Sequence, residues 1–259
     1  MDSRDGTTGD VEVARDDRVL RVTLNRPSKK NALTRAMYVT LAAALAEAEA
    51  DAAIRVVLFS GGSAAFTAGN DLNDFLAAGR DLTPATQFIA ALSQATKPMV
   101  AAVNGVAVGI GATMLLHCDL VYVGRAASVA FPFLNLALVP EAGSTVLLPA
   151  AIGLPRATSL LYFGEMISGD EAARLGMVTE AVDDERVQEH AAAQAHRLAQ
   201  RAPQALMLTR ALLRKPYAGA VAEATQRELE GFSRLLDSVE AREALTAFKE
   251  KRPPDFSKL

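Results

Sequence analysis

A glycine-rich turn between two apolar segments, within residues 104–145, constrains the fold of this chain most strongly. An apolar run at 99–103 ends in Asn104-Gly105, and Gly109-Ile110-Gly111 then opens a second apolar run that ends at Cys118. This order is typical of a buried strand followed by a helix. Glycines directly before a helix let the backbone approach a ligand closely and leave free N–H groups directed at it.

The second half of this stretch carries one carboxylate, Glu141, in a Val-Pro-Glu-Ala-Gly turn. Backbone N–H groups that stabilise an anion, with an acid on the following loop, indicate chemistry on a carbonyl group. A glycine-rich helix start beside a surface glutamate is the alternative interpretation of the same residues.

Composition and charge narrow the classes of protein to which the chain can belong. It has 259 residues, half of them apolar, and 27 Lys and Arg against 30 Asp and Glu give a net charge of −3. This balance argues against nucleic acid as the main partner. Cys118 is the only cysteine, which excludes an internal disulfide, and the three histidines lack metal-ligand spacing. No segment reads as a signal peptide or a membrane span, so we expect a cytoplasmic protein.

The order of apolar and polar patterns predicts an α/β fold followed by a helical region. We predict a disordered tail at 1–10, a core domain at 11–195 and a helical C-terminal region at 196–259. Thr34 is the expected N-cap of a long helix that reaches residue 50, and Asp71 is the expected N-cap of a shorter one. The other strands are expected at 11–13, 19–24, 55–60, 99–103, 120–123, 128–131 and 177–182, and the other helices at 84–95, 109–118, 155–163, 168–175, 183–201, 203–214 and 219–248.

Six segments, in order, resemble the crotonase superfamily of enoyl-CoA hydratases and isomerases. They are LNRPSKKNAL at 24–33, FTAGNDL at 66–72, NGVAVGIGATMLLHCDLVY at 104–122, FPFLNLALVPEAGST at 131–145, ISGDEAARLGMVTE at 167–180 and FKEKRPPDF at 248–256. The resemblance covers the chain beyond the tail. It implies a crotonase-like spiral of ββα units, a C-terminal all-helical trimerisation region, an acyl-CoA thioester substrate and a homotrimer or dimer of trimers.

The resemblance also implies an oxyanion hole made by two backbone N–H groups. These are the N–H groups of Asn70 and of Ile110, which stands where relatives usually have glycine. Two such donors would polarise the thioester carbonyl and stabilise an enolate, and loss of one typically costs about 10²–10³ in rate.

The acidic residues separate the possible reactions. Typical hydratases of the superfamily carry two glutamates at the positions that match Thr113 and Phe133 here. Neither residue can act as a base, whereas hydration needs groups that position a water molecule and transfer its proton. The chain looks most like the peroxisomal-type Δ3,Δ2-enoyl-CoA isomerases, in which one glutamate at the position of Glu141 is the base.

Further contacts with the substrate follow from the resemblance. Lys29 and Lys30 fall in the loop that lies near the CoA phosphates in relatives, although solvated loop lysines are the alternative interpretation. The full expected substrate-binding set is Lys29, Lys30, Ala68, Asn70, Asp71, Leu72, Gly109, Ile110, Phe133, Leu136 and Phe256. No metal is implied, and no cofactor beyond the CoA moiety of the substrate.

Three functions are compatible with these residues. The first is isomerisation of 3-enoyl-CoA to 2-enoyl-CoA by a single-glutamate proton shuttle. The second is an enoyl-CoA hydratase or another crotonase-type reaction in fatty acid metabolism. The third is a non-catalytic acyl-CoA-binding subunit, in which Glu141 is merely a turn residue.

Overall fold

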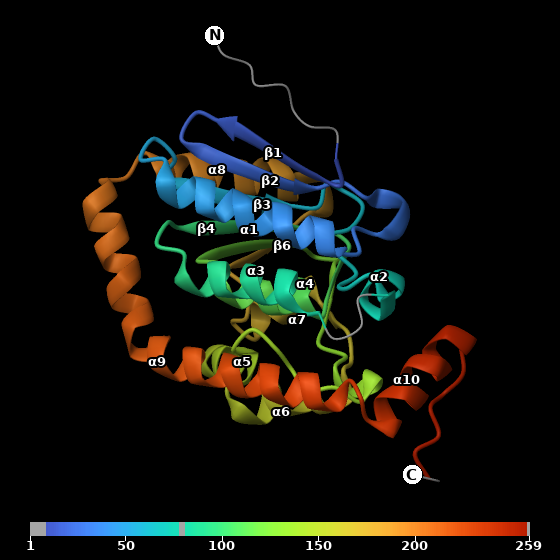
Figure 1. Ribbon diagram of the computed structural model, residues 1–259. Helices are drawn as coiled ribbons and strands as arrows, with labels where there is room; N and C mark the ends of the chain where they lie inside the picture. Colours follow the sequence, from blue (N-terminus) through green and yellow to red (C-terminus); the bar gives the residue numbers. More distant parts are fainter. Residues whose placement is uncertain (1–8, 78–80, 258–259) are drawn as a thin grey trace.

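The computed structural model describes residues 9–77 and 81–257 (Figure 1). Residues 1–8 of the predicted tail lie outside the described residues. The chain is α/β, as predicted, and the division into 11–195 and 196–259 stays a prediction. Within the described residues, no helix is long and apolar enough to cross a membrane.

The main sheet has six strands in the order β1-β2-β3-β4-β6-β9. β1 and β2 form an antiparallel hairpin, and each later neighbour pairs in parallel. Parallel neighbours require crossover connections, which here contain the helices. The strands are β1 (Val11–Asp16), β2 (Val19–Leu24), β3 (Val56–Ser60), β4 (Met99–Val103), β6 (Leu120–Gly124) and β9 (Glu180–Val182).

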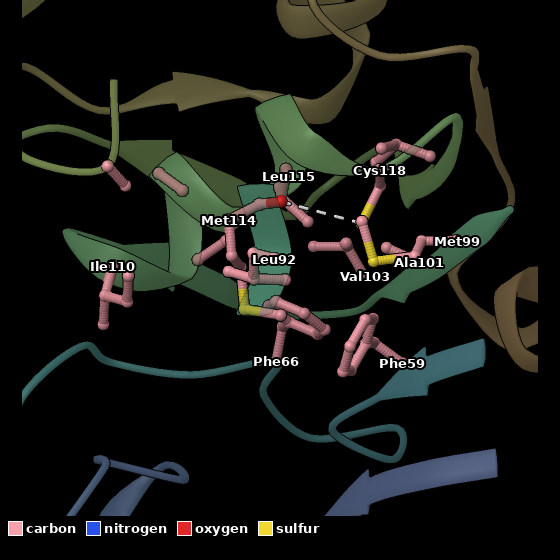
Figure 2. Close-up of a cluster of buried hydrophobic side chains, with 14 of the residues drawn as sticks. Phe59, Phe66, Leu92, Met99, Ala101, Val103, Ile110, Met114, Leu115 and Cys118 are labelled. Carbon is pink, nitrogen blue, oxygen red and sulfur yellow. Dashed lines mark hydrogen bonds between the residues drawn. The ribbon is translucent and has the colours of Figure 1, made fainter. Parts of the chain in front are cut away.

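Helices cover both faces of this sheet, so its central strands are apolar on both sides. In β3, Val56 and Leu58 pack in a cluster with α8 (Val187–Ala199), which follows the 3₁₀ turn η4 (Asp184–Arg186). The alternate residues Val57 and Phe59 belong to the larger core, which includes α1 (Arg35–Ala50) and α3 (Thr83–Gln94). Figure 2 shows Phe59 in that core with Met99 and Met114.

Two predicted helix caps are confirmed. The Thr34 hydroxyl accepts a hydrogen bond from the Met37 N–H at 3.3 Å and starts α1. The Asp71 carboxylate accepts from the N–H groups of Asn73 and Asp74, at 3.0 and 3.1 Å, and starts α2 (Leu72–Ala77). Each cap satisfies N–H groups that have no acceptor within the helix.

A second, smaller sheet lies beside the glycine-rich turn and was not expected from the sequence. It joins β5 (Val106–Val108), β7 (Ser128–Ala130) and β8 (Ile167–Ser168). The predicted helix at 109–118 is a single α-helical turn, α4 (Ile110–Thr113), followed by the 3₁₀ helix η2 (Met114–His117). β5 and β8 have only three and two residues, too few for an alternating pattern to reveal them.

The C-terminal half is helical, with one correction to the prediction. The helices predicted at 203–214 and 219–248 were divided at the wrong place, because α9 (Pro203–Leu235) runs through Pro216 and α10 (Val239–Glu250) starts after the Ser238 cap. Figure 1 shows α9 bending midway along its length, the usual consequence of an internal proline. The remaining helical elements are η1 (Pro27–Lys29), η3 (Leu134–Leu136), α5 (Ser144–Ile152), which was not predicted, α6 (Leu154–Phe163) and α7 (Gly169–Arg174).

Candidate active site

Two segments that lie far apart in the sequence run side by side at the site. The Thr67 N–H donates to the Val106 carbonyl at 2.9 Å, and the Val108 N–H donates to the Thr67 carbonyl at 3.0 Å. Gly69 has a φ of +87°, and a Cβ there would lie 2.8 Å from the Val108 oxygen. Only glycine fits this close approach, so Gly69 lets the segment that ends at Asn70 pack against the glycine-rich turn.

Hydrogen bonds around Asn70 direct its N–H away from the neighbouring chain. The Leu33 N–H donates to the Gly69 carbonyl at 2.7 Å, and the Asp71 N–H donates to the Leu33 carbonyl at 2.8 Å. Because the Gly69 carbonyl and the Asn70 N–H lie on opposite sides of one trans peptide, the Asn70 N–H points away from Leu33. It therefore does not bond to Leu33, as its predicted role of donor to the substrate requires.

The second predicted donor is the N–H of Ile110, at the start of α4. As the first residue of a helix, Ile110 has no acceptor for its N–H within that helix. Gly109 before it adopts φ 58° and ψ −119°, a conformation that is strained for any residue with a Cβ. The two predicted donors thus lie on adjacent segments, as an oxyanion hole requires.

Glu141 sits in a turn that tertiary contacts hold in an unusual conformation. Ala142 and Gly143 follow it with φ of +60° and +68°. The Ala142 carbonyl lies 2.7 Å from Nε2 of His117 in η2. Burial lowers the pKa of His117 to about 4, so the ring is neutral at pH 7 and donates its Nε2–H to this carbonyl. This bond anchors the turn to the core.

The environment of Glu141 favours its neutral form. Its Oε1 is buried and has no hydrogen-bond partner among the described residues. Burial, and then the nearby charge of Glu228, raise the pKa of Glu141 to about 8, while the Thr113 hydroxyl acts in the opposite direction. A carboxyl group with such a pKa can take up and return a proton near neutral pH.

Glu141 and Asn70 line the same cavity, which has a volume of about 480 Å³. The Tyr38 hydroxyl, also in its wall, donates to Oδ1 of Asn70 at 2.5 Å. Burial raises the pKa of Tyr38 well above its usual value, so it stays a protonated donor. The apolar wall comes from α2, α3, α9 and the residues just before α1 and α3. It includes Leu33, Phe75, Leu82, Ile89, Leu229 and Phe232.

Other predicted contact residues lie elsewhere in the site region. Ile110 is 1% exposed, and Figure 2 shows its side chain in the core, so only its backbone can face the substrate. Phe133 is buried and Leu136 is half-buried, and neither lines the cavity. Their binding role stays a prediction.

The residues predicted to contact CoA lie on the loop after β2, at the start of α2 and near the C-terminus. Lys29 and Lys30 are exposed, and the Lys30 carbonyl accepts from the Ala68 N–H at 2.9 Å, which places these segments together. Asp71 pairs with Arg26 at 2.7 Å, in addition to capping α2. Leu72 is half-buried at the start of α2. Phe256 is 42% exposed near the C-terminus.

Three residues around Glu141 carry no signal in the sequence that marks them as functional. Tyr38 follows the helical spacing of core residues in α1, and Glu228 lies among polar residues of a long helix. His117 lacks metal-ligand spacing, so its pattern in the sequence points to no function. Within the ranges 9–77 and 81–257, no group of three or more His, Cys, Asp and Glu residues is placed to hold a metal ion.

Comparison with known proteins identifies the family. Residues 14–258 match the family model described as enoyl-CoA hydratase/isomerase. The chain belongs to this family. It is 34% identical over 249 residues to the 2,3-dehydroadipyl-CoA hydratase of Escherichia coli (strain K12), covering 94% of this chain and 97% of that protein. It is 33% identical over 205 residues to enoyl-CoA delta isomerase 2 of Rattus norvegicus, covering 76% of this chain and 52% of that protein.

Solved structures agree with this placement. The structure of Pseudomonas aeruginosa OdaA superposes with a TM-score of 0.89 and 46% identity, covering 93% of this chain and 99% of that one. The chain therefore has the crotonase fold with a C-terminal helical region, and it is an enzyme of the enoyl-CoA hydratase/isomerase family. An acyl-CoA thioester substrate fits this family.

Proposed function

We propose that this member of the family shifts the double bond of a 3-enoyl-CoA to the 2-position, with Glu141 as its acid–base group. The observation that carries the proposal is the buried, unpartnered Oε1 of Glu141 in an apolar cavity beside Asn70. By the family resemblance, Thr113 and Phe133 match the positions of the two hydratase glutamates, and neither residue can act as a carboxylate base.

The proposed reaction uses one base for both proton transfers. The Glu141 carboxylate removes a proton from C2, and the C–H electron pair moves toward the thioester oxygen to form a dienolate. The N–H groups of Asn70 and Ile110 stabilise the negative charge on that oxygen. Glu141 then returns the proton to C4, the C2=C3 bond forms and the carbonyl is restored.

The raised pKa of Glu141 suits this cycle. With a pKa of about 8, the carboxylate is a stronger base than an ordinary glutamate, and its acid form can still release the proton to C4. Because catalysis starts from the carboxylate, we expect kcat/KM to rise with pH up to about 8. The apolar wall of the cavity supports the burial that produces this pKa.

Hydration, or another crotonase-type reaction, is the second candidate. It draws support from relatives that carry hydratase names, including the protein of Escherichia coli described above. The non-catalytic acyl-CoA-binding subunit is the third candidate, and it requires that Glu141 exchange no proton. A homotrimer or dimer of trimers, CoA contacts through Lys29, Lys30 and Phe256, and a cytoplasmic location stay predictions.

Parallel assays separate these candidates. The purified enzyme would receive a 3-enoyl-CoA, with isomerisation followed, and a 2-enoyl-CoA, with water addition followed. Isomerisation without hydration, lost in Glu141→Gln but not in Glu223→Gln, is the expected result. Glu223 is a suitable control because its side chain is 63% exposed and pairs with Arg227 on α9. Rapid hydration of the 2-enoyl-CoA would refute the single-acid mechanism.

Hydrogen exchange at C2 tests the third candidate, the non-catalytic acyl-CoA-binding subunit. A saturated acyl-CoA in deuterated water should exchange its C2 hydrogens in the presence of the enzyme, because exchange needs only Glu141 and the oxyanion hole. Binding without exchange would favour the non-catalytic subunit.

A further inference from the structure

Glu228 is a buried acid on an otherwise polar, exposed stretch of α9. Its residue is 6% exposed, whereas its neighbours Arg227 and Leu229 both lie at the surface. Acidic side chains are rarely buried to this extent unless they are paired with donors. The position of Glu228 therefore calls for a specific set of partners.

Those partners all belong to the turn and helix that follow Glu141. The Glu228 carboxylate accepts from the Gly143 N–H at 2.6 Å, from the Thr145 N–H at 2.9 Å and from the Thr145 hydroxyl at 2.6 Å. Gly143 is the N-cap residue of α5 and has no side chain to cap it. Glu228 thus caps α5 from a different helix, 85 residues further along the chain.

We infer that Glu228 is a positioning residue for Glu141: it fixes the turn that carries Glu141 and places a second negative charge beside it. The bonded Gly143 N–H lies only two residues after Glu141. The inference rests on the proposed function, in which Glu141 must be held at a fixed place and must be basic enough to remove a C2 proton.

The other groups around Glu141 do not replace this charge. Tyr38 of α1 stays protonated, and His117 of η2 is neutral at pH 7. Arg35, Asp74 and Asp81 line the same cavity, and Arg35 is already paired with Asp81. After burial, Glu228 is the next largest cause of the high proton affinity of Glu141. The cap on α5 and the basicity of Glu141 therefore share one carboxylate.

A purely structural cap makes a different prediction from a positioning role. A structural cap affects stability alone, whereas a neighbouring charge also changes the proton affinity of Glu141. The titration of Glu141 in the ligand-free enzyme separates the two roles. Carbon-13 NMR of protein labelled at the glutamate carboxyl carbons reports this titration, and the Glu141→Gln variant assigns the Glu141 signal.

In Glu228→Gln we expect the Glu141 midpoint to fall by about one pH unit or more, because a like charge has been removed. Glu228→Asp keeps the charge but places it farther from Glu141, because the side chain is one methylene shorter. Its Glu141 midpoint should lie between those of the wild type and Glu228→Gln. Glu223→Gln removes a charge from the exposed side of the same helix and should leave the midpoint unchanged. The acid limb of the kcat/KM profile should move in the same direction as the NMR midpoint.

An unchanged Glu141 midpoint in folded Glu228→Gln would overturn the inference. If that variant does not fold, an unchanged midpoint in Glu228→Asp would overturn it equally. The NMR titration needs no turnover, so an enzyme that fails to isomerise would refute the proposed function while leaving the Glu228 result intact. A normal isomerase with an unmoved midpoint would refute only the role of Glu228.

Discussion

Replacing Glu141 by Gln should stabilise the folded protein at high pH, although it removes the proposed base. The ordinary pKa of 4.5 applies in the unfolded chain, and burial raises it to about 8 in the folded one. Between these values the unfolded state has lost the proton that the folded state still binds. The free energy of unfolding therefore falls as pH rises through this window. Gln carries no charge in either state, so the free energy of unfolding of the variant does not fall for this reason.

The size of this stability difference follows from the shift in the pKa of Glu141 between the unfolded and the folded chain. A difference of about 3.5 pH units, at about 1.36 kcal/mol per unit, corresponds to about 5 kcal/mol. Most of it, about 4 kcal/mol, develops between about pH 5 and pH 9. Urea denaturation of both proteins at these two pH values, at one fixed subunit concentration, measures it. Titrating groups that do not interact with Glu141 cancel in the comparison between the two proteins.

The stability difference should therefore grow in favour of Glu141→Gln as pH increases. Glu223→Gln, at an exposed position, should show no such trend. A difference between Glu141→Gln and the wild type that is the same at both pH values would refute the assigned burial of the carboxylate. It would also remove the basis for its proposed basicity.

Three further predictions test other parts of the site. His117→Leu removes the donor to the Ala142 carbonyl. Urea denaturation at pH 7 should show a free energy of unfolding lower by about 1–3 kcal/mol. An unchanged free energy of unfolding would mean that this bond does not anchor the turn. In Gly109→Ala the added Cβ meets no atom within 4 Å, but the residue must adopt a positive φ, so the free energy of unfolding should fall by about 1–3 kcal/mol. The turnover rate should fall by a larger factor than the affinity for acyl-CoA. Full turnover would argue against the glycine-rich turn as part of the oxyanion hole. Asp74 and Asp81 outnumber Arg35 in the cavity, so at pH 7 calorimetry should find adipyl-CoA bound about tenfold more weakly than hexanoyl-CoA. Equal affinities would contradict this charge argument.

The local patterns of the sequence were sufficient for much of the framework. Continuous apolar runs predicted β3, β4 and β6 because strands covered on both faces contain few polar residues. Thr34 and Asp71 predicted helix starts because a cap depends on the few residues that follow it. Glu141 stood out because it follows a glycine-rich turn and a strand.

Tertiary structure alone determined the properties of the site. The sequence predicts a break between helices at 203–214 and 219–248, yet α9 continues through Pro216 because packing against α5 and the core overrides a local propensity. Glu228 looks like any surface glutamate in sequence and becomes a buried cap only where α9 meets the start of α5. The pKa of Glu141 likewise depends on burial and on Glu228, which the fold brings together. The sequence by itself determined which residues could act, and the fold determined their protonation and their neighbours, because electrostatic energies depend on distance and burial rather than on separation along the chain.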